Sequence, residues 1–175
     1  NVEEEHLDYY TRGIAQIREV FNNLLNQTSG SIFYCCECEE ATQLCGTRDN
    51  SISYGWKEAD WTATDLSGQI GTVSFTVNYK GQELGRVQLG IPGLHNVLNA
   101  LGAIAVASSC GVDFSKMNQA LSSFAGAKRR FETKHLSKRY RIVDDYGHHP
   151  TEVAATLQTA RSYEPDRVIV LFQPH

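Results

Sequence analysis

The chain has 175 residues, and its 20 Asp and Glu outnumber its 16 Lys and Arg, which gives a formal net charge of −4. That length allows one large core, or one domain and part of another. The acidic balance argues against the broad basic face that non-specific nucleic-acid binding needs. The longest apolar stretch, 97–107, is far shorter than the ~20 residues of a membrane span, and no signal-peptide pattern opens the chain. We expect a soluble, cytoplasmic protein.

The first half of the chain predicts two helices and a strand, followed by a β-rich region. Apolar side chains recur at a three-to-four spacing in residues 9–27, which is typical of a helix with one buried face. This face comprises Ile14, Ile17, Val20, Phe21, Leu24 and Leu25. A buried strand at 31–36 and a short helix at 39–45 should follow. Short alternating runs then predict partly antiparallel strands at 51–56, 59–64, 71–79 and 83–89, with a hairpin turn at Lys80-Gly81.

The second half predicts two more helices, at 95–110 and 114–124, and then a β-α-β unit. The unit comprises a strand at 140–144, a helix at 151–163 and a strand at 167–172. Two strands are too little sheet to stand alone, and the second ends where a ligand-binding loop would begin. We therefore expect a piece of a larger protein, with the latter part of one domain at 1–127 and the beginning of another at 128–175.

Four of the five cysteines cluster in a short segment, at Cys35, Cys36, Cys38 and Cys45. Thiolates at short spacing are typical zinc ligands. However, the spacing here is CC-x-C-x6-C, with no second C-x-x-C pair and no nearby histidine. The pattern favours reduced thiols that line a strand and the next helix.

The segment DDYGHHP, residues 144–150, places several polar groups between an apolar strand and a helix. Ligands of open α/β sheets collect at the carboxyl ends of parallel strands, near helix N-termini. Asp144 and Asp145 fall at such an end, and His148 and His149 precede the helix. One of these residues could merely cap the helix, but capping does not need all four. The cluster therefore predicts a functional site.

A second polar group, His95-Asn96-x-x-Asn99, opens the long apolar helix. Residues 96 and 99 share one face of a helix, and 95 and 99 are also neighbours. Two amides and an imidazole offer the paired donors and acceptors that recognise an adenine edge. The alternative is that these are ordinary loop and cap residues of the first helical turn.

Two charged clusters leave their roles open. The run Glu3-Glu-Glu-His6-Leu-Asp8 could hold a cation such as Mg²⁺, or its acids could load a helix N-terminus with favourable charge. The run from Lys128 to Phe131 places guanidinium groups near the expected domain junction, where they could reach phosphate oxygens or form a solvated linker. No G-x-x-x-x-G-K-[ST] phosphate loop occurs in the sequence.

Together these motifs resemble the Mur ligases, the ATP-dependent amide-forming enzymes of bacterial peptidoglycan synthesis. They occur in the family's order: N-x-x-x-E-H-L-D-x-Y at 1–10, G-L-H-N-V-L-N-A at 93–100, F-x-G-x-x-R-R-F at 124–131, DDYGHHPTE at 144–152 and FQPH at 172–175. The resemblance implies an α/β fold. It comprises an incomplete P-loop-type central ATP-binding domain with a β-rich segment, then the first β-α-β unit of a Rossmann-like C-terminal domain. The family's phosphate loop would lie before Asn1.

The resemblance also implies roles for individual residues. His6 matches a histidine that binds magnesium, and Arg130 an arginine that meets the phosphates; Asp145 matches an aspartate on the ribose side. The remaining matches are His95, Asn96 and Asn99 near the nucleotide, and His148, His149 and His175 near the substrates, with Arg130 and His148 as the catalytic candidates. Three features depart from the family: Glu5 replaces an aspartate, the stretch 130–144 is short, and the cysteine cluster is extra.

The implied activity is the joining of L-alanine to UDP-N-acetylmuramate in the bacterial cytoplasm, with ATP and Mg²⁺, through an acyl phosphate. Domain closure should complete the site because both domains contribute to it, so we expect residues 1–175 alone to be inactive. Two alternatives share these motifs. One is a ligase that recycles an intact tripeptide onto the same sugar, and the other is a non-catalytic nucleotide-binding module.

Overall fold

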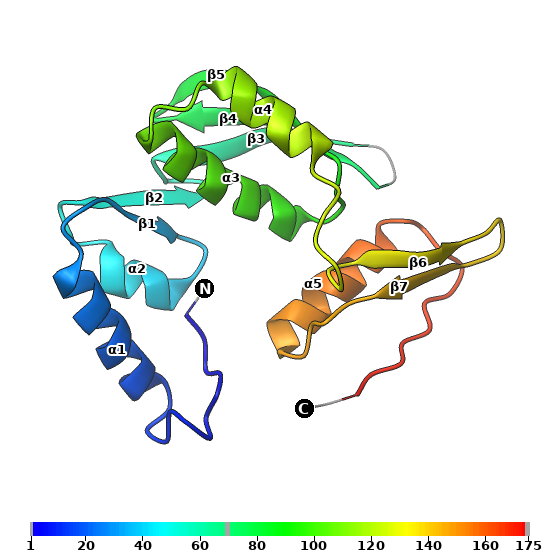
Figure 1. Cartoon of the computed structure of the whole chain (residues 1–175), viewed down its shortest axis with the longest axis horizontal. Coiled ribbons are helices and arrows are strands. Elements are labelled where there is room, and N and C mark those ends of the chain that lie inside the picture. The colour runs from blue at the N-terminus through cyan, green and yellow to red at the C-terminus, as the bar shows by residue number, and fades with distance from the viewer. Residues whose placement is uncertain (1, 69–70, 174–175) are drawn as a thin grey trace.

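Residues 2–68 and 71–173 are described in a computed structural model, which forms a five-stranded sheet and a separate two-stranded sheet with five helices around them (Figure 1). The helices are α1 (Ile14–Gln27), α2 (Glu39–Cys45), α3 (Leu94–Ser109), α4 (Phe114–Ser123) and α5 (Pro150–Arg161). The strands are β1 (Ile32–Cys35), β2 (Ser51–Gly55), β3 (Trp61–Ser67), β4 (Val73–Tyr79), β5 (Gln82–Leu89), β6 (Glu132–Leu136) and β7 (Arg141–Asp144). None of the helices within these ranges has the length and apolar character to cross a membrane. The mixed α/β class that the sequence predicts is confirmed.

The larger sheet runs in chain order from β1 to β5. Strands β1, β2 and β3 are parallel, whereas β3, β4 and β5 are antiparallel. The β4–β5 hairpin turns at Lys80 and Gly81, whose φ angles of 48° and 79° are both positive. Positive φ at both central residues suits a tight hairpin turn, because its twist matches that of the flanking strands. The expected antiparallel hairpin is therefore confirmed.

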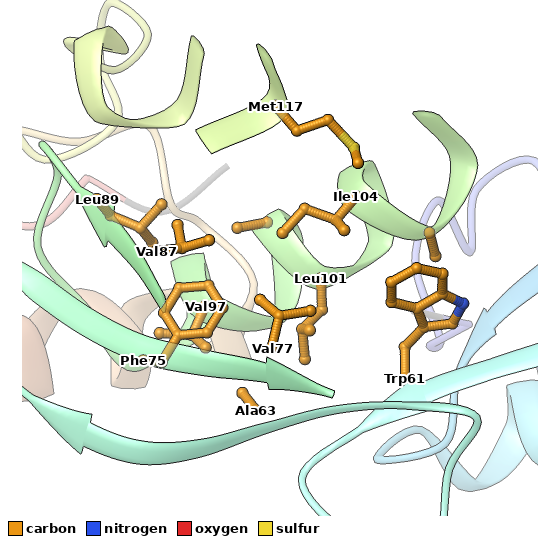
Figure 2. Close-up of a cluster of buried hydrophobic side chains, with 12 residues drawn as sticks. Trp61, Ala63, Phe75, Val77, Val87, Leu89, Val97, Leu101, Ile104 and Met117 are labelled. Atoms are coloured by element: carbon orange, nitrogen blue, oxygen red, sulfur yellow. The ribbon is translucent and has the colours of Figure 1, made fainter. Parts of the chain in front are cut away.

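The main core lies between this sheet and helix α3, which crosses one face of it (Figures 1 and 2). Phe75 and Val77 of β4 and Val87 of β5 are fully buried, as are Val97 and Leu101 of α3. Residues two apart in a strand, and three or four apart in a helix, share one face. This packing fixes the N-terminal turn of α3 above the sheet, where the His95-Asn96-x-x-Asn99 motif lies.

Helix α1 is shorter and less buried than its pattern predicts. It begins at Ile14 rather than residue 9, behind Gly13, which has φ of 61°. Ile17 is buried, but Val20, Phe21 and Leu24 are 46%, 36% and 60% exposed. The predicted face is therefore buried only in part, at Ile17 with Ile14 and Leu25 packed beside it. Helix α1 packs against α2 at the margin of the molecule, and only the side of the helix around Ile17 is covered (Figure 1).

The region beyond residue 127 differs most from its prediction. The sequence pattern missed β6, whose side chains are mostly exposed and which pairs antiparallel with β7. The predicted strand at 167–172 is not formed, and Ile169 and Leu171 are 77% and 102% exposed. A strand needs a neighbour for its backbone hydrogen bonds, and this segment pairs with none of the described residues. The structure therefore shows a β-hairpin followed by α5, not a β-α-β unit.

Candidate functional site: a cavity between two parts of the chain

A cavity of about 1200 Å³ opens between helix α3, the connecting segment 124–133 and helix α5. Its wall contains all five residues predicted to contact a nucleotide: His95, Asn96, Asn99, Arg130 and Asp145. The first three come from α3 on the large sheet, and the other two lie beyond residue 127. Polar groups from both parts of the chain therefore face one shared space.

The two asparagines are not equivalent. The Asn96 Nδ2 donates to the Pro92 carbonyl at 2.6 Å, and the Asn96 Oδ1 accepts from Asn99 Nδ2 at 3.2 Å. Asn96 thus bonds within the first turn of α3, which agrees with the alternative that it is an ordinary residue of the first helical turn. The Asn99 amide oxygen has no hydrogen-bond partner among the described residues, and the side chain is exposed on the cavity wall. Asn99 therefore retains both an acceptor and a second N–H for a ligand.

His95 is partly buried, and its surroundings favour the neutral imidazole. Burial lowers the pKa of His95 below its ordinary value of 6.5. Asp145 raises this pKa and Arg130 lowers it, both by less than the effect of burial. At pH 7 the imidazole is uncharged, so it can donate one hydrogen bond and accept another.

Asp145 fixes the loop that contains Arg130. One carboxylate oxygen accepts from the Phe131 N–H at 2.8 Å, and the other accepts from the Gly147 N–H at 2.7 Å. A further backbone bond, from Tyr146 N–H to the Arg129 carbonyl at 2.8 Å, joins the same two segments. A carboxylate has about four acceptor positions, so Asp145 can still accept from ligand hydroxyl groups.

Arg130 is held by Glu152, a residue that the sequence analysis did not select. The Arg130 Nη1 lies 3.0 Å from Glu152 Oε1. Burial raises the pKa of Glu152, but hydrogen bonds from Arg130 and from the N–H groups of His148 and His149 outweigh burial, so this pKa lies below its ordinary value. The signal in the sequence was the position of Glu152 in the first helical turn, two residues after Pro150, although the N-cap residue His149 is not the Ser or Thr of the usual capping box.

His148 and His149 face the N-terminal segment and are absent from the residues that line the cavity. The His148 Nε2 lies 3.4 Å from Glu5, and the His149 Nδ1 lies 2.8 Å from Glu3. The same Nδ1 lies 3.4 Å from the Thr151 N–H, which needs it as an acceptor. The contact with the Glu3 carboxylate is the shorter of the two, so His149 Nδ1 carries the hydrogen and donates to Glu3. A nitrogen that donates cannot also accept from the Thr151 N–H. His149 therefore serves mainly as the partner of Glu3.

Three other candidates lie apart from this cavity or outside the described residues. His6 is exposed, and among residues 2–68 and 71–173 no three His, Cys, Asp or Glu side chains gather as a metal site. The same finding applies to the cysteine cluster. Burial raises the pKa of the Cys35, Cys36 and Cys45 thiols, which favours the protonated form. His175 lies outside the described residues.

Comparison with known families places these observations in context. Residues 1–107 match the model of the Mur ligase middle domain, and residues 129–175 match that of the Mur ligase glutamate ligase domain. The chain belongs to the Mur ligase family. This Mur ligase chain is 40% identical to UDP-N-acetylmuramate--L-alanine ligase of Geobacter sulfurreducens and 41% identical to that of Desulfosudis oleivorans. Each alignment covers 100% of the chain and 39% of the relative, so the chain spans about two fifths of these relatives' length.

Solved structures of Mur ligases share this fold. UDP-N-acetylmuramate-alanine ligase MurC from Thermotoga maritima superposes with a TM-score of 0.82 at 31% identity, over 98% of this Mur ligase chain and 39% of that structure. A murein peptide ligase from Psychrobacter arcticus gives 0.58 at 28% identity, over 86% and 33%. MurF ligase from Thermotoga maritima in complex with ADP gives 0.70 at 19% identity, over 91% and 37%, which shows a shared fold only.

Proposed function

We propose that these residues are part of an ADP-forming ligase that joins L-alanine to UDP-N-acetylmuramate in the bacterial cytoplasm, during synthesis of peptidoglycan precursors. The main supporting observation is the cavity that brings Asn99, His95, Arg130 and Asp145 together from two parts of the chain. We assign residues 1–127 to the ATP-binding middle domain and 128–175 to the C-terminal ligase domain. Since the chain spans about two fifths of its relatives, the activity is that of the whole protein.

The donors and acceptors in the cavity suit a nucleoside triphosphate. Asn99 offers the paired acceptor and donor that an adenine edge requires. Asp145 retains acceptor positions for ribose hydroxyls. Arg130 uses one of its five N–H donors on Glu152 and keeps the others for phosphate oxygens. Base, sugar and phosphate therefore each meet a side chain of matching chemistry.

The reaction needs activation because a carboxylate is a poor electrophile. The substrate carboxylate attacks the γ-phosphorus of ATP, the bond to ADP breaks, and an acyl phosphate forms. The alanine amine then attacks the acyl carbon, loses a proton and releases inorganic phosphate. Arg130 would neutralise charge that develops on the transferred phosphoryl group, and the neutral His95 would donate or accept a hydrogen bond beside it.

The remaining assignments follow the family resemblance. We propose Mg²⁺ as a cofactor, with His6 as one ligand, although no group of three or more His, Cys, Asp or Glu among the described residues could hold a metal ion. Mg²⁺ usually takes one or two protein ligands beside substrate phosphates. We propose that His148, His149 and His175 contact the alanine and the uridine-linked acid. For His148 and His149, this requires Glu5 and Glu3 to share or release them.

The assay uses the whole protein with ATP, Mg²⁺, UDP-N-acetylmuramate and L-alanine, and it measures phosphate release together with the amide product. Release should depend on both substrates, and substitution Asn99→Ala should raise the KM for ATP. Replacing alanine by the intact tripeptide tests the recycling alternative. The higher TM-score of the alanine ligase structure favours alanine. Nucleotide binding without product formation from either amine would contradict the ligase proposal and support a binding module.

A further inference from the structure

We propose that Glu152 is a positioning residue that aims Arg130 into the cavity. This inference rests on the proposed function for the identity of the ligand, a nucleoside di- or triphosphate, but not for the geometry. Glu152 and Arg130 both line the cavity. Their side chains, 33% and 53% exposed, meet at 3.0 Å although they are 22 positions apart in the sequence.

Glu152 is itself held in place by helix α5. It is the third residue of the helix, and its Oε2 accepts from the backbone N–H of His148 at 3.1 Å and of His149 at 3.4 Å. These bonds satisfy N–H groups that the start of a helix leaves without intrahelical partners. One oxygen therefore fixes the carboxylate to the helix, while Oε1 remains for Arg130.

The backbone of Arg130 is fixed by different contacts. Its own N–H donates to the Ala127 carbonyl at 3.2 Å, and the flanking Phe131 N–H donates to Asp145. Arg129 and Phe131, on either side, have positive φ angles of 56° and 49°. The loop is thus shaped without Glu152. Within this loop, only the direction of the long Arg130 side chain depends on the Glu152 carboxylate.

The contact leaves the guanidinium able to bind an anion. Glu152 accepts from Nη1 alone, and in the part of the chain that the structure describes, no other hydrogen bond to the Arg130 guanidinium occurs. A free arginine side chain samples many rotamers, and fixing it costs conformational entropy on binding. A side chain already held toward the cavity loses less of that entropy when a phosphate arrives. The carboxylate therefore prearranges the cation for the phosphate.

The test is a double-mutant cycle on the whole protein, with the affinity for ADP measured by titration calorimetry. Glu152→Gln keeps an oxygen for the backbone N–H groups but places an amide against Arg130. We expect it to weaken ADP binding about tenfold, and to change it less than twofold in an Arg130→Ala background. The matched control is Glu40→Gln. Glu40 also lies in the first turn of a helix, α2, and pairs with an arginine, Arg18 of α1, but neither residue lines the cavity. That control should leave ADP affinity unchanged.

Equal weakening in both backgrounds would overturn the proposal, because Glu152 would then act independently of Arg130. Unchanged or tighter ADP binding in Glu152→Gln would also overturn it, since the carboxylate would then only compete with phosphate for the cation. Thermal melting of each variant separates these results from unfolding. The ADP measurement needs neither alanine nor the uridine-linked acid. Failure of the ligase assay would therefore leave this result interpretable, and failure of the cycle would not affect the ligase assay.

Discussion

The imidazole of His149 and the carboxylate of Glu3 lie 2.8 Å apart, although they belong to opposite ends of the chain. Their side chains are 20% and 30% exposed, so the pair is only partly screened by water. It joins the segment before α1 to the start of α5. Together with the contact between His148 and Glu5, the pair therefore connects the N-terminal and C-terminal regions.

Removing the contact between Glu3 and His149 should lower the stability of the folded chain modestly. We expect Glu3→Ala to lower the free energy of unfolding by about 0.5–1 kcal/mol, a typical net contribution of one side-chain hydrogen bond. In a His149→Ala background the same change should cost much less, which urea denaturation of the four proteins would show. Identical costs in the two backgrounds would mean that the two side chains do not interact.

Gly93 should tolerate no side chain. A Cβ there would lie 2.6 Å from the His95 ring and 2.7 Å from the Thr159 hydroxyl, and the φ of 99° is itself unfavourable for other residues. We expect Gly93→Ala to destabilise the chain by roughly 1–3 kcal/mol. Gly30→Ala is the matched control, because nothing lies within 4 Å of its Cβ position. Similar melting temperatures for the two variants would contradict the close approach of α3 and α5.

Leu101 provides a test of the main core. Its side chain is 0% exposed between α3 and the sheet. Leu101→Ala should cost about 2–5 kcal/mol, because the substitution removes buried methyl groups and leaves a cavity. Val106→Ala on the same helix, at a side chain 45% exposed, should change stability by less than about 0.5 kcal/mol. A small cost at Leu101 would show that α3 does not pack as described.

The titration of His95 tests the electrostatics of the cavity. Its pKa, read from the pH dependence of the imidazole NMR signals, should lie below 6.5 because burial disfavours the charged form. Asp145→Asn should lower this pKa further, and Arg130→Ala should raise it. The folded state then binds fewer protons than the unfolded state, so stability should fall as pH drops below 6.5 and through the folded pKa. A pKa at or above 6.5 would show that burial does not dominate the titration of His95.

The sequence predicted best those elements whose pattern and packing agree. Helix α3 and the β4–β5 hairpin follow from a strongly apolar run and from Lys80-Gly81, and both are central to the core. Strand β6 was missed because its residues are mostly polar and exposed, so that no alternation marks it. The segment 167–172 has a strand-like composition but no partner strand among the described residues. Pairing is a property of the neighbours, and local sequence does not encode it.

For the site residues too, the residue type could be predicted from the sequence, whereas the contacts with distant residues could not. Motif positions such as Asn99, Arg130 and Asp145 could be selected by residue type, and the structure places them around one cavity. The contacts of Arg130 with Glu152 and of Asp145 with the Phe131 N–H could not be predicted, because the partners are distant in sequence. Glu152 lies in the first turn of a helix, where an acidic residue is common, so its contact with Arg130 was not predicted. The contacts of His148 with Glu5 and of His149 with Glu3 become evident only in the folded structure.

The bonds from Phe131 to Asp145 and from Tyr146 to Arg129 have a mechanical consequence. They join residues 129–131 to residues 145–147, so these two segments should move as one unit. Any rotation between the two parts of the chain would then occur at residues 124–128. A rotation there would change the span between Asn99 and Asp145 but preserve that between Arg130 and Asp145. For the nucleotide that we propose, the phosphate contact of Arg130 and the sugar contact of Asp145 would then form together, and the base contact of Asn99 would depend on the extent of the rotation.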